Sequence, residues 1–112
     1  MTTRGSRFLT MCEGGNVRSV ALAFVLKDNY GQDAIACSWR SNTRETRNML
    51  YAWADYIVVM QPHFAEHVPG EFAPKVRCVD VGPDSYGTPM HGDLLAELNK
   101  VVRGWRDRGW KI

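Results

Sequence analysis

A cysteine and an arginine six positions apart are the residues of this chain whose types and spacing best suit chemistry on phosphate. Residues 12–19 read CEGGNVRS. A cysteine thiolate is a strong nucleophile, and an arginine can donate two parallel hydrogen bonds to two phosphoryl oxygens. A helix N-terminus and a nearby guanidinium both favour the thiolate over the thiol. The spacing therefore indicates that Cys12 attacks phosphorus, Arg18 binds the phosphate and Ser19 hydrogen-bonds the sulfur.

The residues between Cys12 and Arg18 suit a loop that wraps around an anion. None of them is proline, so every backbone N–H is available, and two adjacent glycines tolerate positive φ angles. The predicted phosphate-binding residues are Glu13, Gly14, Gly15, Asn16, Val17, Arg18 and Ser19. The alternative interpretation is a buried structural cysteine in front of a glycine turn.

Such a loop must follow a strand and lead into a helix. Residues 7–11 (RFLTM) predict that strand, and residues 17–27 predict the helix. Further strands are predicted at residues 33–38, 56–60 and 76–81. Strands that alternate with helices indicate an α/β fold, in which helices cover both faces of a parallel sheet. Ligands of such folds bind at the carboxyl ends of the strands.

Three helical segments are predicted between and after these strands. One follows Asn42, which has Glu45 at the capping-box spacing, with Met49, Leu50 and Trp53 on one face. A short helix over 61–72 breaks near Pro69. The last helix begins near Asp93, and its apolar face consists of Leu94, Leu95, Leu98, Val101, Val102 and Trp105.

Length and composition predict one domain over residues 1–112. A chain with 45% apolar residues can form a core without disulfides or a structural metal. No segment is long and apolar enough to span a bilayer, the N-terminus lacks the pattern of a secretory signal, and the cysteines are irregularly spaced. We therefore expect a cytoplasmic protein without a membrane partner.

No cofactor or metal is expected from the sequence. His63 and His67 are four residues apart and could form a weak metal-binding face, but a solvated pair explains them as well. The net charge of +2 is too small to indicate nucleic acid as the main partner. The segment RGW occurs at 103–105 and again at 108–110, and basic residues among aromatics can bind nucleic acid. The alternative, which we favour, is a helix end whose tryptophans pack on the core.

Three stretches together resemble the low-molecular-weight protein tyrosine phosphatases, in the form of a short bacterial member. Residues 12–19 are similar to the active-site loop C-x-G-N-x-x-R-S of that family, and residues 80–87 (DVGPDSYG) resemble its late acid loop D-P-Y-Y-G. Residues 53–60 (WADYIVVM) are similar to the run that leads into the third strand of short bacterial relatives. The resemblance implies a four-stranded parallel sheet in the order 2-1-3-4, with the phosphate-binding loop after strand 1.

The resemblance also implies the general acid. It matches Asp84 to the acid of the late loop, with Ser85 in place of the proline and Tyr86 as the one tyrosine retained. A carboxylic acid at this place protonates the leaving oxygen and then takes a proton from water. Asp80 is the rival candidate. Trp39 and Tyr86 could form aromatic walls of the substrate pocket, although Trp39 is equally compatible with the core.

Some positions depart from the family pattern. Gly15 stands where the family has asparagine, Asn16 comes one position later, and Glu13 places a negative charge beside an anion site.

The expected function is hydrolysis of phosphotyrosine or similar phosphate monoesters, with a phosphorylated protein or a small phosphate ester as partner. The alternatives are a non-catalytic binder of phosphorylated ligands and an arsenate reductase, which needs two further cysteines close together.

Oxidation of Cys12 is expected to inactivate the protein, because an exposed thiolate is readily oxidised. Val17 cannot trap the sulfenic acid, and Cys78 is expected on a distant strand. If the strand order is 2-1-3-4, Cys37 is the only plausible disulfide partner. Its side chain could instead point into a helix-covered face, and this second outcome is the one we expect.

Overall fold

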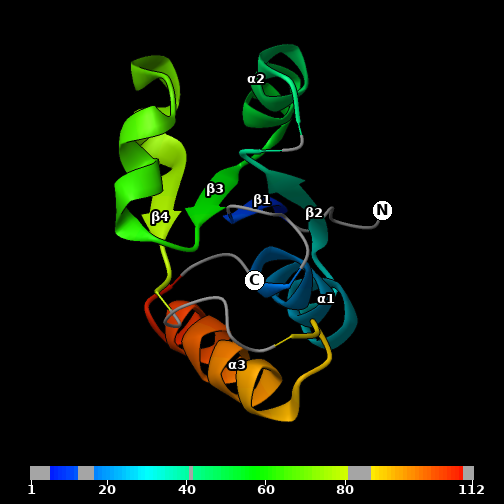
Figure 1. Cartoon of the computed structure of the whole chain (residues 1–112). Coiled ribbons are helices and arrows are strands. Elements are labelled where there is room, and N and C mark those ends of the chain that lie inside the picture. The colour runs from blue at the N-terminus through cyan, green and yellow to red at the C-terminus, as the bar shows by residue number, and fades with distance from the viewer. Residues whose placement is uncertain (1–5, 13–16, 41, 81–86, 110–112) are drawn as a thin grey trace.

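Four parallel strands form the sheet at the centre of the molecule. A computed structural model describes residues 6–12, 17–40, 42–80 and 87–109 of the chain (Figure 1). The strands are β1 (Arg7–Cys12), β2 (Asp33–Ser38), β3 (Tyr56–Val59) and β4 (Val76–Cys78), in the order β2-β1-β3-β4. The predicted α/β class and strand order are therefore confirmed.

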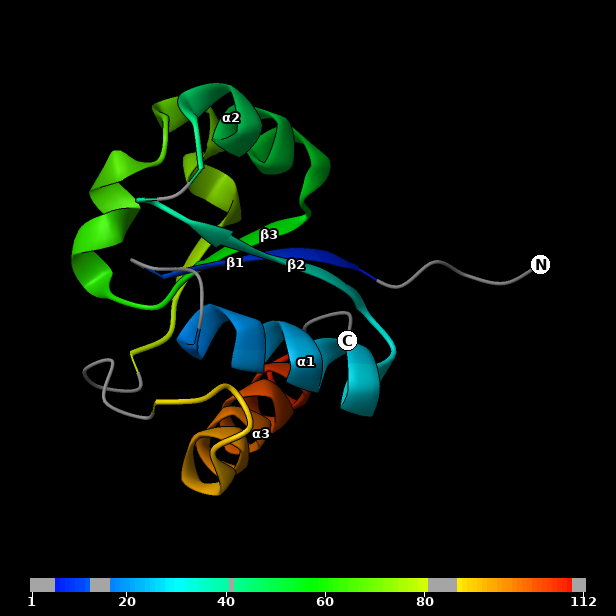
Figure 2. The ribbon, with the colours of Figure 1, turned by 45° about the vertical axis from the view of Figure 1, so that its right-hand side comes forward.

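Helices cover both faces of this sheet (Figure 2). One face carries α1 (Arg18–Tyr30) and α3 (Gly92–Asp107). The opposite face carries α2 (Arg44–Trp53) and two 3-10 helices, η1 (Pro62–His67) and η2 (Gly70–Lys75). The layers are those of a three-layer sandwich, because each strand of a parallel sheet must have helices on both sides to bury its side chains.

The alternation of side chains along β1 divides the core into two parts. Phe8 and Cys12 point toward α1 and α3, in what we call the α1/α3 core. Leu9 and Met11 point toward α2, in the α2 core. Phe8 stacks on Trp105, with ring centres 6.2 Å apart. The side-chain period of two residues thus sends neighbouring residues of β1 to opposite layers.

The structure corrects the prediction for the second helix. Its N-cap is Thr43 instead of Asn42, and the Thr43 hydroxyl accepts a hydrogen bond from the Thr46 backbone N–H. Met49, predicted on the buried face, is 70% exposed. The fully buried residue of this helix is Tyr51. The sequence pattern missed it because the aromatic rings that receive Tyr51 come from segments far away in the sequence.

The structure also corrects the type of the helix predicted over 61–72 and the length of the strand predicted over 76–81. The helix expected over 61–72 is instead the pair of 3-10 helices, with Val68 and Pro69 between them. The side chain of His63, predicted to form a weak metal-binding face with His67, lies outside the described part of the structure. Strand β4 ends at Cys78, earlier than predicted. Position 81, its predicted end, lies outside the described residues.

The last helix confirms the core interpretation of the first RGW segment. Leu94, Leu98, Val102 and Trp105 are buried, and Leu95 and Val101 are partly buried against the same core. Trp105 is therefore occupied by packing and is not available for a base. Trp110 lies outside the described residues.

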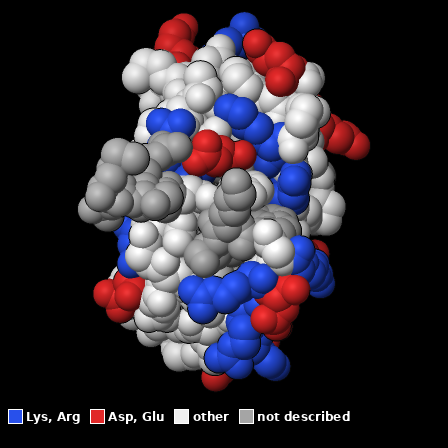
Figure 3. Space-filling view, turned by 180° about the vertical axis from the view of Figure 1, so that it is seen from behind, with Lys and Arg blue, Asp and Glu red and all other residues white. Residues whose placement is uncertain are grey.

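Charged side chains of both signs occur on the face shown in Figure 3, and lysines and arginines lie on both its upper and its lower half. None of the helices formed by the described residues has the length and apolar character needed to cross a membrane.

Candidate active site

Cys12 is the last residue of β1, at the carboxyl edge of the sheet. Its carbonyl oxygen accepts a hydrogen bond of 3.4 Å from the Trp39 backbone N–H, and its register partner on β2 is Ser38. On the other side, the Met60 N–H donates to the Met11 carbonyl at 2.9 Å. Backbone pairing therefore holds the cysteine on both sides. The thiol is 0% exposed, in contrast to the exposed thiolate expected from the sequence.

Ser19 connects this cysteine to the start of α1. Its Oγ lies 3.1 Å from Cys12 Sγ, and either atom can be the donor. The Thr10 hydroxyl donates to the Ser19 carbonyl at 2.7 Å, and both residues are fully buried. The contact expected between Ser19 and the sulfur is present. Because Thr10 holds the serine in place, the hydroxyl is pre-positioned to stabilise a negative sulfur.

The N-terminus of α1 has no side-chain cap among the described residues. Its N-cap residue is Val17, whose side chain cannot accept a hydrogen bond, and the first turn contains no acidic residue. The first N–H groups of a helix need partners and carry partial positive charge. Arg18, the first residue of the helix, is 1% exposed. A guanidinium and the N-terminus of a helix thus lie within a few residues of Cys12, which is an arrangement that attracts phosphate.

Several predicted site residues lie outside the described part of the chain. They are Glu13, Gly14, Gly15 and Asn16 of the first loop, and Asp84, Ser85 and Tyr86 of the second. The rival acid Asp80 is described. It is exposed just beyond β4, beside a hollow that Lys100 and Arg108 also line. The choice between Asp80 and Asp84 as general acid remains a prediction.

Comparison with known proteins identifies the fold. No protein-family model matches the sequence, and no curated protein sequence matches it either. Among solved structures, Wzb from Vibrio vulnificus, in complex with benzylphosphonate, has a TM-score of 0.68 and 16% identity, over 93% of this chain and 99% of that one. The chain has the fold of the low-molecular-weight phosphatases.

Two further structures agree with this assignment. The tyrosine phosphatase AmsI of Erwinia amylovora has a TM-score of 0.71 and 12% identity, over 96% of this chain and 95% of that one. The arginine phosphatase YwlE from Geobacillus stearothermophilus has a TM-score of 0.65 and 15% identity, over 92% of each chain. The resemblance predicted from three short stretches is therefore confirmed at the level of the fold. At these identities the likeness concerns the arrangement of the backbone.

Trp39, predicted as a possible wall of the substrate pocket, packs on the α2 side of this phosphatase fold. Its ring lies 5.4 Å from that of Phe64 and 5.7 Å from that of His67, centre to centre. The Arg47 guanidinium lies 5.5 Å from the Trp39 ring centre, a distance typical of a cation–π contact. The tryptophan is thus both part of the α2 core and a wall of a cavity on that side.

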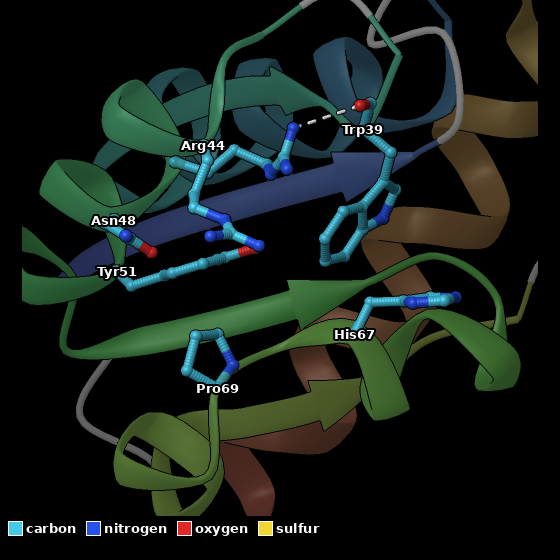
Figure 4. A pocket seen from close by; sticks show the side chains of 7 residues that line it. Trp39, Arg44, Asn48, Tyr51, His67 and Pro69 are labelled. Atoms are coloured by element: carbon cyan, nitrogen blue, oxygen red, sulfur yellow. Dashed lines mark hydrogen bonds between the residues drawn. The ribbon is translucent and has the colours of Figure 1, made fainter.

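That cavity was missed by the sequence analysis. It has a volume of about 450 Å³ and its lining includes Trp39, Arg44, Arg47, Asn48, Tyr51 and His67 (Figure 4). We call it the basic pocket. Burial raises the pKa of Tyr51 to about 12, against the opposing charge of Arg47, so its hydroxyl stays protonated at neutral pH. The spacing of Arg44, Arg47 and Asn48 places them on one helix face, a signal that could have revealed the pocket.

The other two cysteines lie apart from Cys12 and from each other. Cys37 is buried in the α2 core, whereas Cys12 belongs to the α1/α3 core, so their side chains leave neighbouring strands on opposite faces. Burial raises the pKa of Cys37. Cys78 is exposed on β4. Partial burial of its thiol is the larger cause, and the negative charge of Asp80 the smaller cause, of a raised pKa. Neither thiol is placed to form a disulfide with Cys12, because the Cβ atoms of a disulfide must face each other.

This separation predicts irreversible oxidation. Cys12 is buried in this structure, but a nucleophile that reacts with a phosphate ester must also be reachable by the smaller hydrogen peroxide. We therefore expect hydrogen peroxide to abolish phosphatase activity, and prolonged exposure to leave a fraction that dithiothreitol does not restore, because neither of the other two thiols is placed to trap the sulfenic acid of Cys12. The measurement is best made on Cys78→Ser, so that the exposed thiol does not contribute. Full recovery in this variant, lost when Cys37→Ser is added, would instead make Cys37 a resolving thiol.

Proposed function

We propose that this chain is a cysteine-dependent phosphatase that hydrolyses phosphotyrosine or similar phosphate monoesters. The observation that carries the proposal is the contact of 3.1 Å between Cys12 Sγ and Ser19 Oγ, at the end of β1 and beside the uncapped N-terminus of α1. The phosphatase fold supports it, as does the benzylphosphonate bound to the Vibrio vulnificus neighbour. This ligand resembles an aryl phosphate in shape and charge.

The proposed reaction has two displacements at phosphorus. The Cys12 thiolate attacks, an S–P bond forms, and the ester P–O bond breaks while Asp84 gives its proton to the leaving oxygen. Asp84 then takes a proton from water, which attacks phosphorus and breaks the S–P bond, while Ser19 donates to the departing sulfur. Arg18 and the backbone N–H groups neutralise the phosphoryl oxygens throughout.

The positions of the cysteines argue against arsenate reduction. That reaction needs two further thiols that can meet, but Cys37 is buried on one edge strand of the sheet and Cys78 lies on the other edge strand. Adjacent strands are about 4.8 Å apart, so these two strands are separated by roughly 14 Å.

Turnover of p-nitrophenyl phosphate by the purified protein tests the proposal. We expect release of p-nitrophenol at neutral pH, unchanged by a chelator, because Arg18 and the helix N-terminus supply the positive charge. Phosphoarginine should be assayed in parallel, since one neighbour of the same fold is an arginine phosphatase. Activity on phosphoarginine alone would change the substrate class, and activity on neither compound would favour a non-catalytic binder of phosphorylated ligands.

The role of Asp84 predicts a dependence on the leaving group. We expect Asp84→Asn to slow alkyl phosphates by about 10²-fold or more, and to slow p-nitrophenyl phosphate much less, because nitrophenolate leaves without a proton. The measurement is kcat for a series of esters of increasing leaving-group pKa. The matched control is Asp80→Asn, and a steeper dependence in that variant would move the general acid to Asp80.

A further inference from the structure

The basic pocket combines cations and aromatic rings at the edge of the sheet where Cys12 lies. Arg44 and Arg47 come from the first turn and a half of α2, Trp39 from the segment after β2, and His67 from the end of η1. Neither aspartate nor glutamate occurs among the described residues that line it. Its volume of about 450 Å³ is within the range of ligand pockets, which is roughly 300 to 1,000 Å³.

The two arginines stand where their charges are unfavourable for the helix itself. The N-terminus of a helix carries partial positive charge, so cations in its first turn reduce stability. Arg44 is the first residue of α2 and Arg47 the fourth, and Glu45 between them offsets part of this positive charge. A bound anion would remove this repulsion, because it would meet the helix end and the guanidinium together.

The arginines differ in what they do. Arg47 donates from one nitrogen to the carbonyl oxygens of Trp39, at 3.1 Å, and Asn42, at 2.5 Å, and so holds the connection between β2 and α2. Arg44 is exposed, and it makes no hydrogen bond or ion pair with other residues in the described ranges. Its guanidinium is therefore available to a ligand, with a planar fork that matches a carboxylate.

Two buried polar atoms in the lining of the pocket also have unused hydrogen-bonding capacity among the described residues. The Trp39 indole Nε1 and the Tyr51 hydroxyl are buried, and neither makes a hydrogen bond of good geometry within the described parts of the chain, although the hydroxyl lies beside Arg47. Tyr51 is 1% exposed. A buried donor without a partner costs free energy. Figure 4 shows Trp39, Arg44 and Tyr51 around the same space.

The pocket begins next to the proposed nucleophile. Cys12 pairs with Ser38, and the following residue, Trp39, donates its N–H to the Cys12 carbonyl. Adjacent strands are about 4.8 Å apart, and an extended peptide advances roughly 3.3 Å per residue. Trp39 thus connects the strand end that carries Cys12 with the pocket on the α2 side of the sheet. A peptide that crosses this edge of the sheet with its phosphate at Cys12 would bring a neighbouring side chain toward Arg44.

We propose that the basic pocket binds an acidic side chain next to the phosphorylated residue, so that the preferred substrate is a phosphopeptide with aspartate or glutamate beside the phosphate. This inference rests on the proposed phosphatase function. It assigns Arg44 to substrate recognition and Arg47, with Trp39, to the support of that site.

The test compares two phosphotyrosine peptides that are identical except for flanking glutamates or flanking glutamines. We expect kcat/KM of the wild type to be about three- to tenfold higher for the acidic peptide at about 50 mM salt, and the ratio to fall at higher salt. Arg44→Gln should bring the ratio close to one. The matched control is Arg103→Gln, an exposed arginine of α3 across the sheet, which should keep the wild-type ratio.

Three results separate the failure of this inference from the failure of the proposed function. Equal kcat/KM for both peptides, with turnover present, would refute the acidic subsite and leave the phosphatase intact. Equal loss of preference in Arg44→Gln and Arg103→Gln would assign the effect to net charge, and would also refute it. If p-nitrophenyl phosphate is hydrolysed but neither peptide is, the phosphatase proposal stands and the acidic subsite is refuted. If none of the three is hydrolysed, the phosphatase proposal fails, and fluorescence anisotropy with the same labelled peptides then decides: a tighter Kd for the acidic peptide that depends on Arg44 supports the pocket, and equal Kd values refute it.

Discussion

Replacing Cys12 with serine is expected to abolish turnover of p-nitrophenyl phosphate while vanadate or phosphate still binds. Serine is nearly the same size, so the contact with Ser19 and the pairing of β1 with its neighbours should survive. Its hydroxyl is a far weaker nucleophile than a thiolate at neutral pH. Removal of a covalent nucleophile typically lowers kcat by several orders of magnitude, and we expect a loss of about 10⁴-fold or more.

The measurements are kcat for p-nitrophenyl phosphate and the Kd of phosphate from isothermal titration calorimetry. Cys37→Ser is the matched control, because it alters a buried cysteine whose side chain lies in the α2 core, on the other face of the sheet from Cys12. It should keep most of the activity. Retained turnover in Cys12→Ser would remove Cys12 from the mechanism, and an equal loss in both variants would indicate a general effect of cysteine removal on the fold.

Replacing Arg18 with lysine is expected to lower kcat/KM by about 10²- to 10³-fold, the size of effect seen when one transition-state donor is removed. Lysine keeps the positive charge but loses the fork that bonds two phosphoryl oxygens in parallel. Arg18 is also fully buried at the start of α1, so its planar group occupies a defined space that an ammonium does not fill in the same way. Phosphate affinity should therefore fall together with kcat.

Arg103→Lys, on the exposed side of α3, is the control for this exchange and should leave both quantities at the wild-type level. A thermal melt of each variant shows whether the fold is kept. An Arg18→Lys protein that is folded and fully active would contradict the assignment of residues 12–19 as the phosphate-binding loop, because this segment contains no other arginine.

The order of the elements was predictable because each has a local sequence pattern. The boundaries of β2 at Asp33–Ser38 match the prediction, as short apolar runs between polar turns mark buried strands. The apolar face of α3 was also predicted, from its spacing of three and four residues. The packing of Trp105 on the core was expected as well, but its partner was not, because Phe8 lies at the other end of the chain.

Failures occurred where a side chain interacts with a different secondary-structure element. Asn42 has the residue type and spacing of a helix cap, but its Oδ1 accepts a hydrogen bond of 2.7 Å from the Ser38 N–H, at the end of β2. Thr43 caps the helix instead. Tyr51 is buried because its ring lies 5.5 Å from that of Phe72 in η2, centre to centre. Neither the cap at Thr43 nor the burial of Tyr51 can be predicted from helix periodicity alone, because the partners of Asn42 and Tyr51 lie in other elements.

The sequence by itself determined the order of strands and helices along the chain. It also determined the proposed roles of Cys12, Arg18 and Ser19, because these residues lie in one short segment and their spacing does not depend on tertiary packing. Only the tertiary structure decided what surrounds that segment. Parallel pairing brings the end of β2 beside Cys12, and the side-chain period of two sends Cys37 to the opposite face. The basic pocket forms where α2 and η1 lie on the same face of the sheet, and its residues are spread over positions 39–69. Contacts across that span depend on how whole layers stack, which no local pattern encodes.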